Sequence, residues 1–209
     1  MSAIDLAGDL GLVAICLLSL NILIGLLISV RYNPRSRWPR RRLDLFRYHN
    51  WTGYTGLTFT LAHPLPLAWA ARSRFSWAQI AWPIHAPSQP LVNTLGAIAL
   101  YLVVLVAVTS YYRVALGRQA WKWVHYLSYV AAALFFLHGV VADPALRGAP
   151  LDPLDAEKVV IEACFLLVAA SSFARWRYAR LHPRARRVEA AAPLPYIPGF
   201  ADEEPAAGE

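Results

Sequence analysis

Four histidines are the residues best suited to chemistry, because they form two pairs with nearly equal separations. His63 follows His49 at position i+14, and His138 follows His125 at position i+13, in two different apolar segments. Histidine is rare inside membrane helices and usually faces the interior of the bundle with a partner. Imidazoles that face each other from two helices can bind iron from both sides, as in a b-type haem with two axial histidines. The pattern therefore predicts two such metal centres at different depths in a membrane.

The rise of an α-helix allows the depths of the four histidines to be compared. Counted from the last basic residue before each segment, His49 and His125 lie about 3 and 4.5 Å in, and His63 and His138 both lie about 24 Å in. The two levels are then separated by about 20 Å. On a straight helix, the i+14 spacing leaves an angular offset of about 40°, but the i+13 spacing leaves about 140°. The second pair therefore needs local tightening of its helix, or haems approached from different sides.

Residues around the histidines fit a bound cofactor. Gly53 and Gly56 follow His49 and would let a flat macrocycle approach the backbone, although they would equally let two helices pack closely. Pro64 directly follows His63, so that helix should kink or end there. The cations that could pair with haem propionates are Arg47, Arg113 and Lys122 at one end of the segments, and Arg72 or Arg74 at the other.

The composition indicates a membrane protein. The chain has 209 residues, of which 57% are hydrophobic and only 16% are charged, whereas soluble domains have about 25% charged residues. The net charge of +7 would suggest nucleic-acid binding in a soluble protein, but here it comes from arginines that flank apolar segments, so we expect no nucleic acid. There is no CxxCH motif, which excludes a covalently attached c-type haem.

Five segments are apolar enough, or nearly long enough, to cross a bilayer, which needs about 20 residues each. They predict an all-α integral membrane protein with a five-helix transmembrane bundle. The fifth segment is the weakest because it has only 16 residues and contains Glu162. The predicted spans are 10–30, 48–71, 91–112, 123–142 and 159–174.

Basic residues predict the orientation of the bundle. Sixteen of the 20 Lys and Arg residues follow the first, third or fifth span. By the positive-inside rule, the N-terminus lies outside and the C-terminus lies in the cytoplasm, in a multi-pass protein of the plasma (inner) membrane whose basic loops contact anionic lipid. We expect residues 1–178 to form the membrane domain and residues 179–209 to be a basic, then acidic, disordered tail.

Two segments resemble a known family. RYHNWTGYTGLTFTLAH (47–63) and GRQAWKWVHYLSYVAAALFFLH (117–138) are similar to the ferric reductase-like transmembrane domain, which ferric reductases, NADPH oxidases and the haem-binding membrane subunit of the bacterial methionine sulfoxide reductase system share. The resemblance extends from residue 8 to about residue 178. It implies two non-covalent b haems, an inner one held by His49 and His125 and an outer one held by His63 and His138.

The larger members of that family carry FAD- and NADPH-binding domains after their last span. Here only 35 residues follow Ala174, without a glycine-rich nucleotide loop, so we expect no FAD or NADPH site in this chain. The electron donor is then a separate flavoprotein, a quinol or another soluble carrier. The motif around His63 departs from that of the sulfoxide reductase subunit, so that partner is not implied.

The sequence thus favours transmembrane electron transfer through two bis-histidine b haems, from a cytoplasmic or membrane donor to an acceptor outside. The chain would be the membrane component of an oxidoreductase, and the sequence leaves open whether it is itself an enzyme. One alternative is a quinone-linked cytochrome b that anchors a separate enzyme. Another is a redox-silent transporter or scaffold subunit whose histidines pack or bind metal.

Overall fold

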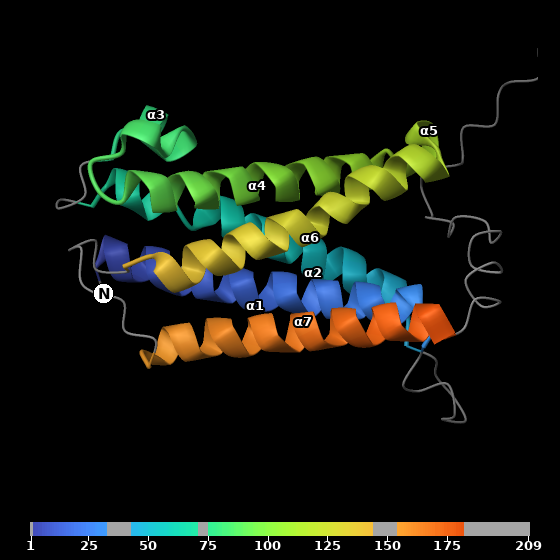
Figure 1. Ribbon diagram of the computed structural model, residues 1–209. Helices are drawn as coiled ribbons and strands as arrows, with labels where there is room; N and C mark the ends of the chain where they lie inside the picture. The colour runs from blue at the N-terminus through green and yellow to red at the C-terminus, as the bar shows by residue number, and fades with distance from the viewer. Residues whose placement is uncertain (1, 33–42, 71–74, 144–153, 182–209) are drawn as a thin grey trace, which may run out of the picture.

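The computed structural model describes residues 2–32, 43–70, 75–143 and 154–181, and all the regular secondary structure in this part of the chain is helical. The predicted all-α class is therefore confirmed (Figure 1). The long helices are α1 (Ala3–Ser29), α2 (Leu45–Ala62), α4 (Pro90–Tyr111), α6 (Arg118–Val141) and α7 (Ala156–Leu181), and the short ones are η1 (Leu65–Ala68), α3 (Trp77–Ala81), η2 (Pro83–His85) and α5 (Arg113–Leu116).

Side-chain caps and a proline define where three of the long helices begin. The Ser2 side chain accepts a hydrogen bond from the backbone N–H of Asp5, while the Asp5 carboxylate accepts one from the backbone N–H of Ser2. Asp44 accepts a hydrogen bond of 3.0 Å from the backbone N–H of Arg47. Pro90 is the first residue of α4, where its missing N–H is not needed. Local sequence thus determines these helix starts.

Helix α2 ends where the sequence predicted a break. Its last residue is Ala62, His63 caps it, and η1 follows after Pro64. Since proline has no backbone N–H and clashes with the preceding turn, the α-helix cannot continue through this point. The predicted span 48–71 is therefore a shorter α-helix followed by a 3-10 turn.

Four of the described helices, α1, α4, α6 and α7, are long and apolar enough to cross a membrane. The chain is therefore a multi-pass membrane protein. Helix α2 does not belong to this set because polar residues, among them Arg47, His49 and four threonines, interrupt its 18 residues. Helix α7 has 26 residues, so the weak fifth segment is longer than the sequence suggested.

The helices pack as two antiparallel hairpins. Helix α1 lies along α2, α4 lies along α6, and α7 contacts α1 and α6 (Figure 1). The two histidine-bearing helices, α2 and α6, run in the same direction but obliquely to each other (Figure 1), and they are not a closely packed pair. Side chains rather than close backbone contacts therefore connect these two helices.

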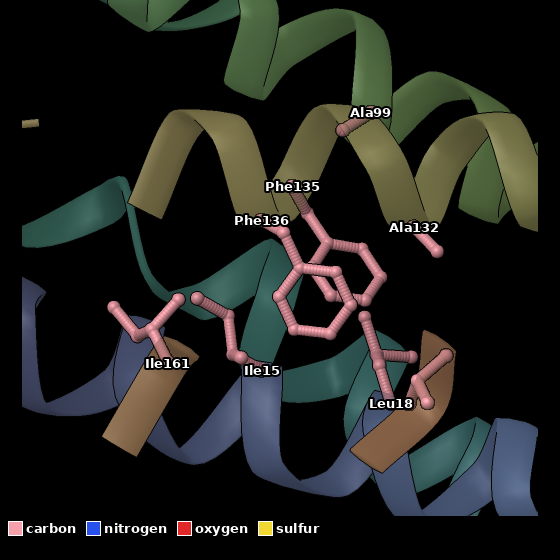
Figure 2. Close-up of a cluster of buried hydrophobic side chains, with 8 residues drawn as sticks. Ile15, Leu18, Ala99, Ala132, Phe135, Phe136 and Ile161 are labelled. Carbon is pink, nitrogen blue, oxygen red and sulfur yellow. The ribbon is translucent and has the colours of Figure 1, made fainter. Parts of the chain in front are cut away.

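A cluster of apolar side chains fills the middle of the bundle. Phe135 and Phe136 of α6, whose ring centroids are 4.4 Å apart, extend toward Ile15 and Leu18 of α1 and Ile161 of α7 (Figure 2). Lipid is as apolar as these side chains, so close packing rather than exclusion from water holds such helices together. The cluster joins α1, α4, α6 and α7.

Candidate functional site

The four histidines meet in the two pairs that the depths predicted. The ring centroids of His49 and His125 are 6.3 Å apart, and those of His63 and His138 are 6.2 Å apart. A metal bonded to two opposite imidazoles puts their centroids about 6 Å apart, since each bond is about 2 Å long and the nitrogen lies about 1 Å from its ring centre. Both pairs therefore have the separation that one metal atom between the rings requires.

The i+13 spacing on α6 does not prevent this pairing. On a straight helix His125 and His138 point about 140° apart, yet each reaches a histidine of α2. Helices α2 and α6 run obliquely (Figure 1), so the face that α6 turns toward α2 changes along its length. Helix α6 is continuous from Arg118 to Val141, and no break in the helix is needed.

Backbone carbonyls orient three of the four rings. The Nδ1 atom of His49 lies 3.0 Å from the carbonyl oxygen of Asn21, and that of His63 lies 2.7 Å from the carbonyl oxygen of Ala7. His138 Nδ1 lies 2.8 Å from the carbonyl oxygen of Val92. A carbonyl only accepts hydrogen bonds, so Nδ1 carries the proton in each ring and Nε2 keeps its lone pair. This is the tautomer that binds a metal through Nε2.

A glycine lies against each of these three rings. A Cβ atom added at Gly25 would come within 3.1 Å of His49, one at Gly11 within 2.9 Å of His63, and one at Gly96 within 2.9 Å of His138. Each glycine stands at position i+4 from the residue whose carbonyl accepts, so both lie on one face of their helix. The same local arrangement therefore occurs twice on α1 and once on α4.

His125 is held differently. Its Nδ1 lies 3.3 Å from the hydroxyl oxygen of Ser110, which also accepts a hydrogen bond of 3.3 Å from Trp121 Nε1. The Trp121 ring lies beside the imidazole, with centroids 5.1 Å apart and planes 31° apart. Side chains thus orient this ring, whereas backbone orients the other three.

Asn21 binds His49 from two directions. Its carbonyl oxygen accepts from the imidazole, and its side-chain Nδ2 donates to the backbone carbonyl of His49 and, at 3.0 Å, to Thr52 Oγ1. An intramembrane asparagine needs such partners because its amide would otherwise remain unsatisfied in an apolar environment. Asn21 therefore fixes both the ring and the helix segment that carries it.

The donor set suits haem better than a bare metal ion. No group of three or more His, Cys, Asp or Glu residues that could hold a metal ion occurs in the described part of the chain. A structural zinc site takes four protein ligands and a catalytic one takes three, whereas haem supplies four nitrogens of its own and needs only axial ligands. Two opposed imidazoles with orienting Nδ1 bonds are therefore a fitting axial pair.

A largely apolar cavity opens beside the His63 and His138 pair. Helices α1, α2, α4, α6 and α7 all contribute to its wall, which includes Gly11, Gly96 and Lys158. Apolar walls exclude water and lower the local dielectric, which strengthens every electrostatic interaction inside.

The two predicted glycines of α2 face a neighbouring helix. A Cβ atom at Gly53 would come within 3.1 Å of Asn21, and one at Gly56 within 2.9 Å of Leu18, so both glycines face α1, as the helix-packing alternative expects. Their role at a cofactor remains a prediction.

Three predicted cations, Arg47, Arg113 and Lys122, lie at the end of the bundle near His49 and His125. Arg113 is 4% exposed and its guanidinium carbon lies 5.0 Å from the centre of the Phe46 ring, whereas Arg47 is exposed and Lys122 is half-buried. Arg72, Arg74 and the predicted tail from residue 182 onward fall outside the described residues.

Sequence reasoning missed the groups that contact the imidazoles from α1 and α4. Gly25 follows Gly11 at position i+14, the same spacing as between His49 and His63. This shared spacing could have indicated that the two glycines face the two histidines. Ser110 and Lys158 had no such signal, since their relevance depends on how helices pack.

A family model described as ferric reductase like transmembrane component matches residues 10–136. The match covers more than half of the chain and includes all of α2 and most of α6. No curated protein and no solved structure matches the chain.

Proposed function

Because the chain belongs to the ferric reductase-like transmembrane family, whose role is transmembrane electron transfer, we propose that it carries electrons through two b-type haems. His49 and His125 would hold one haem, and His63 and His138 the other. The observation that carries this proposal is the matched geometry of the two pairs: centroids 6.3 and 6.2 Å apart, with Nδ1 of three rings directed at backbone carbonyls.

Bound haem supplies one-electron chemistry, and the protein supplies its ligation and surroundings. If two histidines hold each haem, an acceptor would receive electrons at the edge of the cofactor rather than on the metal. The carbonyls of Ala7, Asn21 and Val92 raise the basicity of the imidazoles they accept from. The apolar walls keep water away, and the two centres, about 20 Å apart along the helices, provide a path between the two faces.

We propose that α2 is the fifth span, with the N-terminus outside and the C-terminus in the cytoplasm of the plasma membrane. Its polar residues have partners within the bundle: Thr52 contacts Asn21, and Thr58 and Thr60 donate to the carbonyls of Tyr54 and Gly56. Satisfied polar groups of this kind are tolerated at membrane depth. Arg47, Arg113 and Lys122 would then meet propionates of the inner haem.

A separate electron donor is part of the proposal. It would be a flavoprotein, a quinol or another carrier on the cytoplasmic side or in the membrane, and the acceptor would lie outside. The chain would then act as the membrane component of an oxidoreductase.

The test is an absorption spectrum of the purified protein with a haem count by pyridine haemochrome. We expect a Soret band, α and β bands that sharpen on dithionite reduction, and two haems per chain. A folded but colourless protein would contradict the proposal and leave the redox-silent alternative. If the spectrum is as expected, reduction by a quinol or by a flavin reductase with NADH distinguishes the donors.

A further inference from the structure

Lys158 is a buried cation in the wall of the His63 and His138 cavity. It lies near the start of α7, is 6% exposed, and lines the cavity together with the two histidines. A lysine at a helix end ordinarily extends its ammonium group to the membrane surface, whereas the side chain of Lys158 is largely enclosed and borders the cavity.

A cation in a largely apolar wall is unfavourable unless its charge reaches water or an anion. An anion in the cavity would stabilise this cation through charge-assisted hydrogen bonds. Lys158 is also the only Lys or Arg among the described residues that line this cavity. The cavity therefore has one place where an anion is stabilised.

The other charged side chains in the wall are Asp143 and Glu157. Both would repel a carboxylate that enters the cavity, so a carboxylate bound here needs Lys158 specifically. Arg113, the other buried cation of the described part, belongs to α5 at the opposite end of α6.

We infer that Lys158 binds a propionate of the haem held by His63 and His138. The inference rests on the proposed function, since that haem would bring the carboxylates into the cavity. A cation beside a haem favours the added electron, so Lys158 raises the reduction potential of this haem relative to a site without it. It is a positioning and tuning residue, and its effect is confined to one of the two centres.

The test is an anaerobic redox titration of the purified holoprotein, followed at the α band, for the wild type, Lys158→Met and Lys158→Arg. Lys158→Met should shift the reduction equilibrium of one haem at least tenfold toward the oxidised form, or about 59 mV for a one-electron couple. Lys158→Arg keeps the charge and should retain most of the wild-type value. Resonance Raman bands of the propionates should change in Lys158→Met alone.

Two further variants make the result specific. Arg177→Met removes an exposed cation from the same helix and should leave both potentials unchanged. His49→Ala leaves only the haem of interest, so the Lys158→Met shift should persist in that background. If His49→Ala does not fold, fitting two components in the full protein gives the same information.

Unchanged potentials and propionate bands in Lys158→Met, or an equal shift in Arg177→Met, would overturn the inference. So would slower reduction of an anionic chelate, relative to a neutral acceptor, with both potentials unchanged, because the carboxylate bound by Lys158 would then belong to the acceptor. A wild-type protein without haem contradicts the proposed function instead, and that outcome is visible before any variant is made.

Discussion

The His63 and His138 centre differs from the His49 and His125 centre in what holds the rings. In the first, both imidazoles donate to backbone carbonyls. In the second, His49 does the same, but His125 contacts the Ser110 hydroxyl. A carbonyl only accepts a hydrogen bond, whereas a hydroxyl both donates and accepts. Backbone carbonyls thus fix the tautomer of three imidazoles, whereas the Ser110 hydroxyl influences that of His125.

The helices behind the histidines show the same contrast. On α1, Gly25 follows Gly11 at position i+14, and each lies against a histidine of α2. On α4, Ser110 follows Gly96 at the same i+14 spacing, and the serine takes the place of the second glycine. In each hairpin, two residues at i+14 spacing therefore contact two imidazoles. The hairpins differ at the second of these positions, which is Gly25 on α1 and Ser110 on α4.

Among the residues that support the rings, the largest effect is expected from filling the space that an imidazole occupies. In Gly96→Ala and in Gly11→Ala the new Cβ would lie about 2.9 Å from an imidazole atom of His138 or His63, closer than packed carbon atoms approach. The ring must move away from its partner, so each variant should retain about one haem instead of two. Pyridine haemochrome analysis after detergent purification measures this.

Gly8→Ala is the matched control, because a Cβ there would meet nothing within 4 Å on the same helix as Gly11. It should keep both haems. Two haems in Gly96→Ala as well would mean that the contact with the ring is not needed for binding.

A smaller effect is expected at Asn21. Asn21→Leu keeps the carbonyl that accepts from His49 but removes the side-chain bonds to the His49 carbonyl and to Thr52. Groups that orient a metal ligand typically contribute roughly 10–100-fold to metal affinity, and we expect about tenfold here because the contact between the Asn21 carbonyl and the imidazole remains. Transfer of haem to apomyoglobin should accelerate for one haem only, and equal acceleration for both would contradict a local role.

The smallest effect is expected at Ser110. Ser110→Ala removes the partner of His125 Nδ1, which lowers the basicity of that imidazole and destabilises the ferric form. The potential of one haem should therefore rise, by less than the roughly 59 mV that a tenfold change represents. Ser110→Thr keeps the hydroxyl and should restore the wild-type value in a redox titration, whereas a shift in both haems would indicate a general change in packing.

Sequence alone predicted the features that depend on helix geometry along one segment. The rise per residue sets the depths of His49, His63, His125 and His138, so the pairing followed from spacing, and Pro64 marked the end of α2. The length of α7 was underestimated because the predicted span was bounded by charged residues, Lys158 before it and Arg175 after it, through which the helix continues.

Features that depend on how helices cross could not be predicted. The angular offset of about 140° on α6 was unexplained until the oblique arrangement of α2 and α6 was visible (Figure 1). Likewise Ser110 and Lys158 are unremarkable in sequence, and only packing brings one to an imidazole and the other into the cavity. The cations predicted for the outer centre, Arg72 and Arg74, fall outside the described residues.

Haem stoichiometry in double histidine variants tests the pairing most directly. If His49 and His125 hold one haem and His63 and His138 hold the other, removing both histidines of a pair should lose no more haem than removing one of them. His49→Ala with His125→Ala should therefore bind one haem per chain, as His49→Ala alone does, while His49→Ala with His63→Ala should bind none. His85, which is exposed in η2, provides the control His85→Ala with two haems. One haem retained in the His49 and His63 double variant, or none in the His49 and His125 double variant, would contradict the account.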